Sequence, residues 1–257
     1  MMGMGMFGQG FVGKLAFPSA NVSDRLEKTF TSVNFNMMIM IIYALITIAI
    51  FGMWYYARYE GNFLPSPKKT FNLMMIVAIV ILVPGTQFAA NFIANLTGYI
   101  RPDWLQQYNE LFETSGITDT TFVTVLYSVI LAPICEELIF RGVTMRCARK
   151  ALPFALANLM QAALFGLFHL NWIQGIYAFA LGIVLGYVCE RGGSIYYSMG
   201  LHLLFNLWGT LSGFFPDPGN SVVVLVVVIV VTIVSLVAGF VLFNKGRRKL
   251  PINSTGI

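Results

Sequence analysis

The chain has 257 residues, of which 57% are hydrophobic and 11% are charged. A soluble domain normally carries about a quarter charged residues, so lipid must surround much of this chain and a soluble globular protein is excluded. The net charge of +5 does not indicate nucleic-acid binding, because the basic residues stand at the flanks of apolar segments, where they are typical of membrane topology.

The N-terminal region lacks a basic stretch followed by a continuous apolar core, so we expect no cleaved signal peptide. We interpret residues 1–30 as an interfacial or disordered leader. Beyond it, seven segments meet or approach the ~20 apolar residues that a helix needs to cross a bilayer. They are Asn36–Tyr56, Phe71–Leu96, Thr121–Met145, Pro153–Leu170, Trp172–Cys189, Ile195–Phe215 and Ser221–Phe243.

These segments predict an all-α fold: a polytopic transmembrane helix bundle with about seven spans, or eight if the leader also inserts. We expect one transmembrane domain over residues 31–250 and a short tail over residues 251–257. Between the second and third segments, Asp103–Glu113 resembles an amphipathic surface helix. The apolar side chains that can share its one face are Trp104, Leu105, Tyr108 and Leu111.

Two small-residue patterns bear on packing. Gly182 and Gly186 form a pair spaced by four residues, which lets helix backbones approach closely. We expect this face to pack against another helix of the same bundle; the alternative is that it forms a dimer interface. The three cysteines have no metal-type or redox-type spacing, and we expect Cys135, Cys147 and Cys189 to be small buried residues.

Lysine and arginine residues flank the segments unevenly. With Arg141 left out because it lies within a segment, eleven fall on one side and four on the other. The positive-inside bias then places the C-terminus in the cytoplasm and the N-terminus outside. The eleven are Arg58, Lys68, Lys69, Arg146, Arg149, Lys150, Arg191, Lys245, Arg247, Arg248 and Lys249; the four are Lys14, Arg25, Lys28 and Arg101.

The residues that can carry chemistry stand inside the apolar segments. The chain has two histidines, and both His169 and His202 are in such segments, as are Glu136, Glu137 and Arg141. Ionisable side chains are costly inside a membrane, so each one indicates a functional site or an internal pairing.

Helical spacing separates the two glutamates. Glu137 and Arg141 are four residues apart with the acid first, the favourable order for an ion pair, and a buried carboxylate needs such a partner. Glu136 is rotated by about 100° from Glu137 and is left free to act as a general base or acid.

The histidines have neighbours at the same spacing. Phe165 and His169 share a helix face, so the ring can pack against the imidazole and orient it. His202 and Asn206 also share a face and form a candidate hydrogen-bonding pair that could hold a tautomer or present donors to an oxyanion. This set of functional groups suits amide hydrolysis. The carboxylate would activate water, and the imidazoles and the amide would stabilise the tetrahedral oxyanion.

Other functions fit parts of this pattern. The glutamates, Arg141 and the histidines could form a buried polar network that only locks helices together, or a proton relay in a transporter. An aspartyl protease is not expected, because all four aspartates (Asp24, Asp103, Asp119, Asp217) lie outside the apolar segments. A His-Glu-x-x-His zinc motif is also missing.

Three motifs in order, Glu136-Glu137-x-x-x-Arg141, Phe165-x-x-x-His169 and His202-x-x-x-Asn206, resemble the signature of the CAAX proteases and bacteriocin-processing enzymes. This group is also called the CPBP or ABI family of intramembrane proteases and includes the type II CAAX prenyl endopeptidases. The resemblance covers Thr121–Asn206, which places the catalytic core at residues 121–210.

The resemblance implies a role for each matching residue. Glu136 would activate water with His169 as its partner, and His202 with Asn206 would form the oxyanion side. Glu137, Arg141 and Phe165 would support the site. A catalytically inactive scaffold or immunity protein of the same family is an alternative.

The resemblance leaves the metal open. Glu136, His169 and His202 could hold zinc with an open position, yet the same residues also suit a metal-free glutamate protease. We favour an enzyme that requires no cofactor, because Asn206 suits an oxyanion hole better than a zinc shell. The expected partners are the lipid bilayer and a membrane-associated peptide or protein substrate, such as a CAAX tail or a leader peptide, and no nucleic acid.

Overall fold

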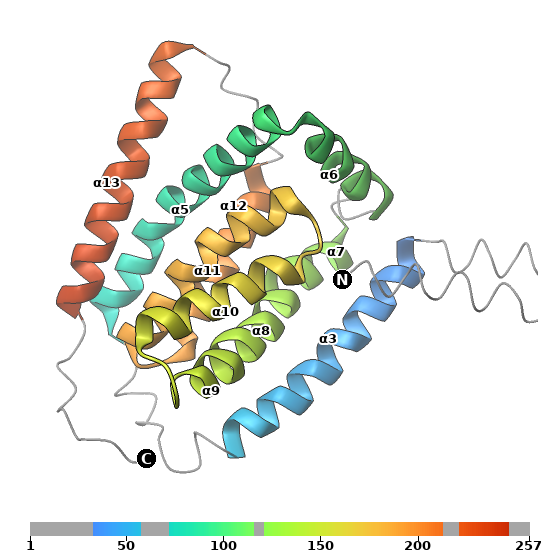
Figure 1. The fold of residues 1–257 in the computed structure, drawn as a ribbon, viewed down its shortest axis with the longest axis vertical. Helices are drawn as coiled ribbons and strands as arrows, with labels where there is room; N and C mark the ends of the chain where they lie inside the picture. The colour runs from blue at the N-terminus through green and yellow to red at the C-terminus, as the bar shows by residue number, and fades with distance from the viewer. Residues whose placement is uncertain (1–32, 58–71, 116–120, 213–220, 247–257) are drawn as a thin grey trace, which may run out of the picture.

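The computed structural model describes residues 33–57, 72–115, 121–212 and 221–246, and every regular element in these ranges is helical (Figure 1). The predicted all-α fold is therefore confirmed for the part of the chain that the structure describes. The predicted leader at 1–30 and tail at 251–257 lie outside these ranges.

Each of the seven predicted segments corresponds to a helix or to a continuous series of helices. They are α3 (Val33–Tyr55), α5 (Leu73–Ile100), the series α7 (Phe122–Val125), η2 (Leu126–Leu131), α8 (Ala132–Glu137), η3 (Leu138–Met145) and α9 (Arg146–Ala148), then α10 (Phe154–Phe168), α11 (Trp172–Gly192), α12 (Ile195–Ser212) and α13 (Val222–Gly246).

Five of these are long and apolar enough to cross a membrane: α3, α5, the α7–α9 series, α11 and α13. The protein is accordingly an integral membrane protein. Helix α10 is a shorter apolar helix, and α12 is not among the five. The predicted count of seven spans is thus supported for five segments and stays a prediction for the other two.

Helix α11 packs against α10, α5 and α12, and α12 packs against α5, α11 and α8. Buried side chains of α5, α11, α12 and α13 form the main apolar core, which includes Leu82, Leu185, Leu201 and Phe243. A second apolar cluster joins α3 to η3 and α12 through Tyr55, among others. Helices α3 and α13 lie on opposite flanks of the bundle (Figure 1).

The predicted surface helix is present as α6 (Pro102–Ser115). Trp104, Tyr108 and Leu111 are half-buried on one face, while the residues between them are exposed. The indole of Trp104 stacks on Trp172 at the start of α11, with ring centroids 5.2 Å apart. Next to it the Arg101 guanidinium donates to Asp103 and holds the pKa of that carboxyl below its usual value.

A proline inside α5 is accommodated by a side chain from α13. Pro84 lies within the helix and has no N–H to donate. The Ser235 hydroxyl accepts from the Gly85 N–H at 2.9 Å and donates to the Ile81 carbonyl, two groups that bond each other in a regular helix. Inside lipid such groups need a partner from the protein, and α13 supplies it.

The glycine pattern on α11 serves close packing within the bundle. A Cβ on Gly186 would lie 1.9 Å from Asn158 Oδ1, and one on Gly182 would lie 3.1 Å from the Cα of Ala162, both on α10. The predicted role of Gly182 and Gly186 inside the bundle is therefore confirmed. A backbone approach this close requires residues without a side chain.

The cysteines are free thiols, and Cys135 and Cys189 are buried as predicted. For Cys147 the prediction was wrong, because this residue is exposed on α9. The reason is its position at the end of the span, where the helix leaves the bundle.

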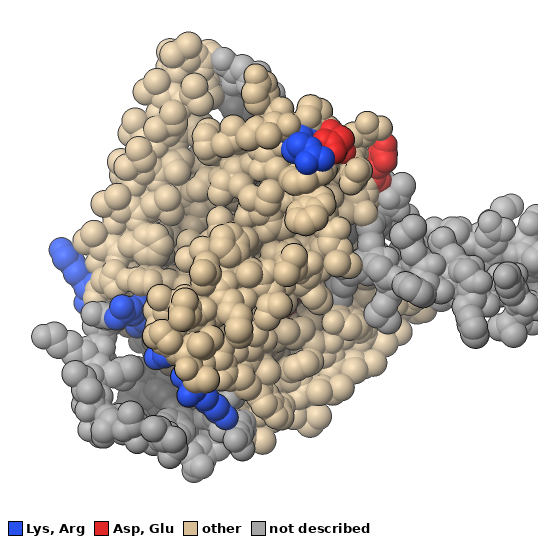
Figure 2. Space-filling view, in the orientation of Figure 1, with Lys and Arg blue, Asp and Glu red and all other residues tan. Residues whose placement is uncertain are grey.

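Charged side chains gather at the two ends of the bundle and leave a wide uncharged band between them (Figure 2). One end holds the described basic residues in and directly after α9 and at the ends of α11 and α13. The ion pair between Arg149 and Glu190, 3.1 Å long, joins two of these termini. The basic residues are Arg146, Arg149, Lys150, Arg191 and Lys245. The opposite end holds Arg101 beside Asp103.

Candidate active site

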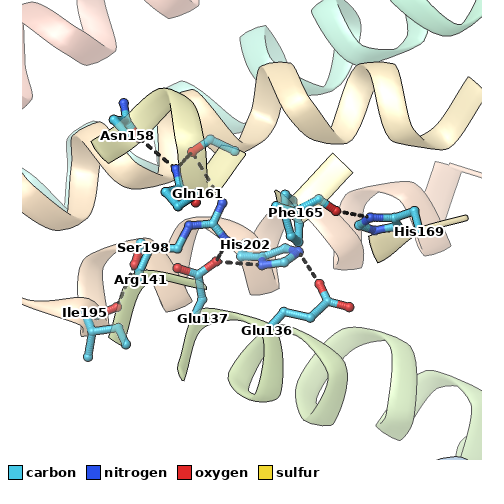
Figure 3. Close-up of polar contacts among 11 residues, drawn as sticks. Glu136, Glu137, Arg141, Asn158, Gln161, Phe165, His169, Ile195, Ser198 and His202 are labelled. Carbon is cyan, nitrogen blue, oxygen red and sulfur yellow. Dashed lines mark hydrogen bonds and ion pairs between the residues drawn. The ribbon is translucent and has the colours of Figure 1, made fainter. Parts of the chain in front are cut away.

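The two glutamates stand on α8, between the π-helical stretches η2 and η3. π-turns are rare and occur frequently at functional sites, because the extra residue per turn redirects the side chains around it. Glu136 and Glu137 point toward α12 from this helix and lie one at each nitrogen of the His202 ring (Figure 3).

The predicted ion pair between Glu137 and Arg141 is confirmed. Arg141 Nη1 donates to Glu137 Oε1 at 2.8 Å, and both side chains are fully buried. The guanidinium also lies over the Phe165 ring, 4.5 Å from its centroid. A charge pair without solvent depends on such contacts, because each ion has lost its hydration.

Polar residues of α10 extend this network, although none of the sequence motifs predicted them. Gln161 Nε2 and Arg141 Nη2 both donate to the Gly182 carbonyl, at 2.8 and 3.3 Å. Gln161 Nε2 also donates to Asn158 Oδ1 at 2.7 Å, and Asn158 donates to the Ile183 carbonyl. The available signal was two amides three residues apart in an otherwise apolar helix.

His202 connects the two carboxylates. Its Nδ1 lies 3.0 Å from Glu137 Oε1, and its Nε2 lies 3.6 Å from Glu136 Oε2. The His202 side chain is 3% exposed, whereas that of Glu136 is 15% exposed. Glu136 is therefore the more accessible of the two acids, and no described hydrogen bond or ion pair joins it to Arg141.

His169 caps the end of α10 and contacts Phe165 in two ways, as the spacing predicts. Its Nδ1 lies 2.8 Å from the Phe165 carbonyl oxygen, and the two rings meet edge to face with centroids 4.9 Å apart. Phe165 also meets the His202 ring at 5.7 Å, so one buried phenyl ring separates and orients both imidazoles. Leu170 follows at a φ of 54°, which ends the helix directly after His169.

The predicted hydrogen bond between His202 and Asn206 is not present among the described residues. His202 bonds to Glu137, and Asn206 Nδ2 donates to the Ser128 carbonyl in η2 at 2.8 Å. The prediction was wrong because each side chain reaches across to a neighbouring helix element. Both residues still lie on the face of α12 that packs against η2 and α8.

The residues proposed as zinc ligands were tested by their arrangement. The described part of the chain contains no group of three or more His, Cys, Asp or Glu side chains arranged to hold a metal ion. The Nδ1 atoms of His169 and His202 are both held by hydrogen bonds, so any metal would have to be bound through their Nε2 atoms. The side chains as placed do not fit a three-residue metal centre, so we assign no step to a metal.

A hollow of about 470 Å³ lies elsewhere, between α10, α11 and α13. Its lining is almost entirely apolar and includes Phe154, Ile183 and Phe240. Asn158 lines it as well, but Glu136, His169 and His202 do not. We place the candidate site at the glutamate–histidine cluster, because the residues that line the hollow include no carboxylate and no imidazole.

Residues 118–208 match the family model described as type II CAAX prenyl endopeptidase Rce1-like. The match spans all three motifs and confirms the family resemblance for this part of the chain. The family that this model describes is one of CAAX-type proteases. No curated protein and no solved structure matches the chain significantly.

Proposed function

We propose that this protein is an intramembrane endopeptidase that hydrolyses a peptide bond in a membrane-associated protein or peptide, of the CAAX-tail or leader-peptide type. The observation that carries the proposal is the position of Glu136. Its carboxylate lies 3.6 Å from the Nε2 of a buried histidine whose other nitrogen is held by a second carboxylate.

The hydrogen-bond partners of the histidines support specific tautomers. The Phe165 carbonyl can only accept, so His169 Nδ1 must carry the hydrogen. Glu137, already paired with Arg141, likewise accepts from His202 Nδ1. In its neutral form His169 then has its lone pair on Nε2, which leaves that atom available for chemistry. His202 Nε2 instead faces the Glu136 carboxylate, where a protonated ring can donate. A carboxylate that fixes a tautomer in this way is known from serine protease triads.

In the proposed reaction, Glu136 takes a proton from water as the oxygen attacks the substrate carbonyl, and His169 is the partner of Glu136. His202 in its protonated form and the Asn206 amide stabilise the negative oxygen of the tetrahedral intermediate. Glu136 then returns its proton to the leaving amine, so that the peptide bond breaks. Fixed donors stabilise such an oxyanion strongly where water is excluded.

We also propose that the reaction needs no metal. The support is the chemistry of one donor: the Asn206 amide is suited to an oxyanion hole more than to a zinc shell. Turnover of purified protein should survive treatment with a zinc chelator. Loss of turnover that returns on addition of zinc would refute this part of the proposal.

The decisive experiment measures cleavage of membrane-associated peptides by purified protein in bilayers. Glu136→Gln keeps the shape of the side chain and removes the base, so kcat should fall by about 10²–10⁴-fold, and His202→Ala should be similarly impaired. Glu110→Gln is the matched control, because Glu110 is exposed on α6 and bonds to Gln106. Equal activity of Glu136→Gln and wild type would end the assignment.

We further propose that the C-terminus faces the cytoplasm and the N-terminus faces outside. The described basic residues at the ends of α9, α11 and α13 support this orientation. Cys147 lies at the same end and is exposed, whereas Cys135 and Cys189 are buried. In sealed right-side-out vesicles a membrane-impermeant maleimide should label Cys147 only after the membrane is opened; labelling of intact vesicles would reverse the orientation.

A further inference from the structure

The helix that carries the glutamates contains a carbonyl group that its own backbone does not satisfy. In η2 the hydrogen bonds run from a carbonyl to the N–H five residues later, as between the Tyr127 carbonyl and the Ala132 N–H. The next carbonyl in this series is that of Ser128, and the residue five positions later is Pro133. Proline has no N–H, so the Ser128 carbonyl has no backbone donor at the position where this hydrogen-bond pattern would supply one.

Asn206 satisfies this acceptor. Its Nδ2 donates to the Ser128 carbonyl at 2.8 Å, across 78 residues of sequence. An unsatisfied carbonyl is expensive at membrane depth, so the bond is strongly favoured over any other position of the amide. Among the described residues, one of the two N–H groups on Nδ2 is used in this way, which leaves the second as a candidate donor.

We infer that Pro133 is a positioning residue: it withholds a backbone donor from the Ser128 carbonyl, and this carbonyl then fixes the amide of Asn206. The inference rests on the proposed function, because it assigns to Asn206 the oxyanion donor named there. It adds a residue that carries no polar side chain and that contacts neither substrate nor a reacting atom.

Helix α5 provides an internal comparison. Pro84 also interrupts a helix at membrane depth, and there the Ser235 hydroxyl bonds to both backbone groups beside the break. That repair uses a side chain with no place in the candidate site, so its effect is on stability alone. At Pro133 the repairing side chain belongs to the site, so the same chemistry fixes a functional group.

The test restores the missing N–H. In Pro133→Ala the new N–H can bond to the Ser128 carbonyl along the helix axis, and Asn206 loses its exclusive acceptor. Because removal of a whole oxyanion donor costs about 10²–10³-fold in kcat, we expect loosening of one to lower kcat by about tenfold, with KM changed less than twofold. Pro84→Ala, which restores an N–H in α5, is the matched control and should leave kcat within twofold of wild type.

A double-mutant cycle separates positioning from general destabilisation. In the Asn206→Ala background, Pro133→Ala should change kcat by less than twofold, because the group on which it acts is gone. An equal fold-change in both backgrounds, or no change in either, would overturn the inference. Pro133→Gly restores the same N–H and serves if Pro133→Ala does not fold.

A second readout does not depend on activity. The side-chain amide signal of Asn206, assigned by its loss in Asn206→Ala, should exchange its protons with water at least tenfold faster in Pro133→Ala than in wild type. If wild type cleaves nothing, the proposed function fails while this measurement still decides the inference. Unchanged exchange would show that Pro133 does not hold the amide.

Discussion

The buried pair of Glu137 and Arg141 permits a prediction that separates stability from activity. Three variants are needed: Glu137→Leu, Arg141→Met, and both changes together. Each single variant leaves one ion in a site where both side chains are fully buried. Such an unpaired ion costs about 3–5 kcal/mol, so either single change should destabilise the fold by that amount.

The double variant should recover most of this loss, because the pair is incompletely satisfied. Glu137 Oε2 and Arg141 Nε have no hydrogen-bond partner among the described residues, and each such buried atom costs about 1–3 kcal/mol. Removing both ions removes both costs. The double variant also leaves one new buried group without a partner, because His202 Nδ1 loses its acceptor. This loss destabilises the fold by about 1–3 kcal/mol. The double variant should therefore lie within about 2 kcal/mol of wild type.

The assay is equilibrium unfolding in mixed micelles with increasing SDS, followed by circular dichroism, with peptide cleavage measured on the same preparations. We expect a near-native unfolding midpoint for the double variant together with at least 10²-fold lower cleavage, because nothing then fixes His202. The reasoning is refuted if the double variant loses as much stability as the two single variants summed.

Two further predictions concern helix packing. Gly186→Ala would place a Cβ 1.9 Å from Asn158 Oδ1 and should destabilise the fold by about 1–3 kcal/mol, whereas Gly200→Ala, with no atom within 4 Å, should not move the unfolding midpoint; equal midpoints for both would contradict the packing of α10 on α11. Ser235→Ala removes the hydroxyl beside Pro84 and should lower the stability by about 1–3 kcal/mol without loss of cleavage. Thr232→Ala is the control, because its hydroxyl donates to the Val228 carbonyl within α13, and it should cost less than half as much.

Contacts within one helix could be predicted from the sequence. The pairs Glu137–Arg141 and Phe165–His169 follow from a spacing of four residues, which places two side chains on one face whatever the rest of the fold. The amphipathic α6 was found in the same way, because the positions of its apolar residues repeat with the helical period. In each case the information is local, and one stretch of sequence contains all of it.

Contacts between helices could not be predicted in this way. The spacing of four residues places Glu137 and Arg141 on one face of the helix. It gives no indication that Glu137 Oε1, which accepts from Arg141, also lies 3.0 Å from His202 Nδ1. Asn206 was paired with His202 for the same reason, although its acceptor is the Ser128 carbonyl. The relative height of α8 and α12 decides both contacts, and single-helix periodicity contains no information on that height.

The π-turns explain part of this difference. In a regular α-helix from Phe122 to Ala148, Pro133 would leave one interior carbonyl, that of Val129, without its donor. The π-turns of η2 and η3 change the rotation per residue and so rotate the side chains of α8 relative to the flanking turns. Sequence periodicity assumes a constant rotation per residue, so it fails where that rotation changes. The site lies where the helix departs from regularity, which is also where a regular-helix prediction is least informative.

The position of Glu137 couples the fold to the proposed chemistry. Its Oε1 accepts from Arg141 and from His202. The carboxylate that pairs with Arg141 one turn later therefore also orients the imidazole on α12. A buried carboxylate is costly without donors. Moving His202 away from Glu137 therefore destabilises the whole network of Glu137, Arg141 and His202, and not one side chain alone. It follows that Glu137→Leu alone should lower both stability and cleavage, whereas removing Arg141 as well should restore stability but not cleavage, because His202 stays released. At Glu136, whose side chain is 15% exposed, a substitution should affect cleavage without this dependence of stability on a buried partner.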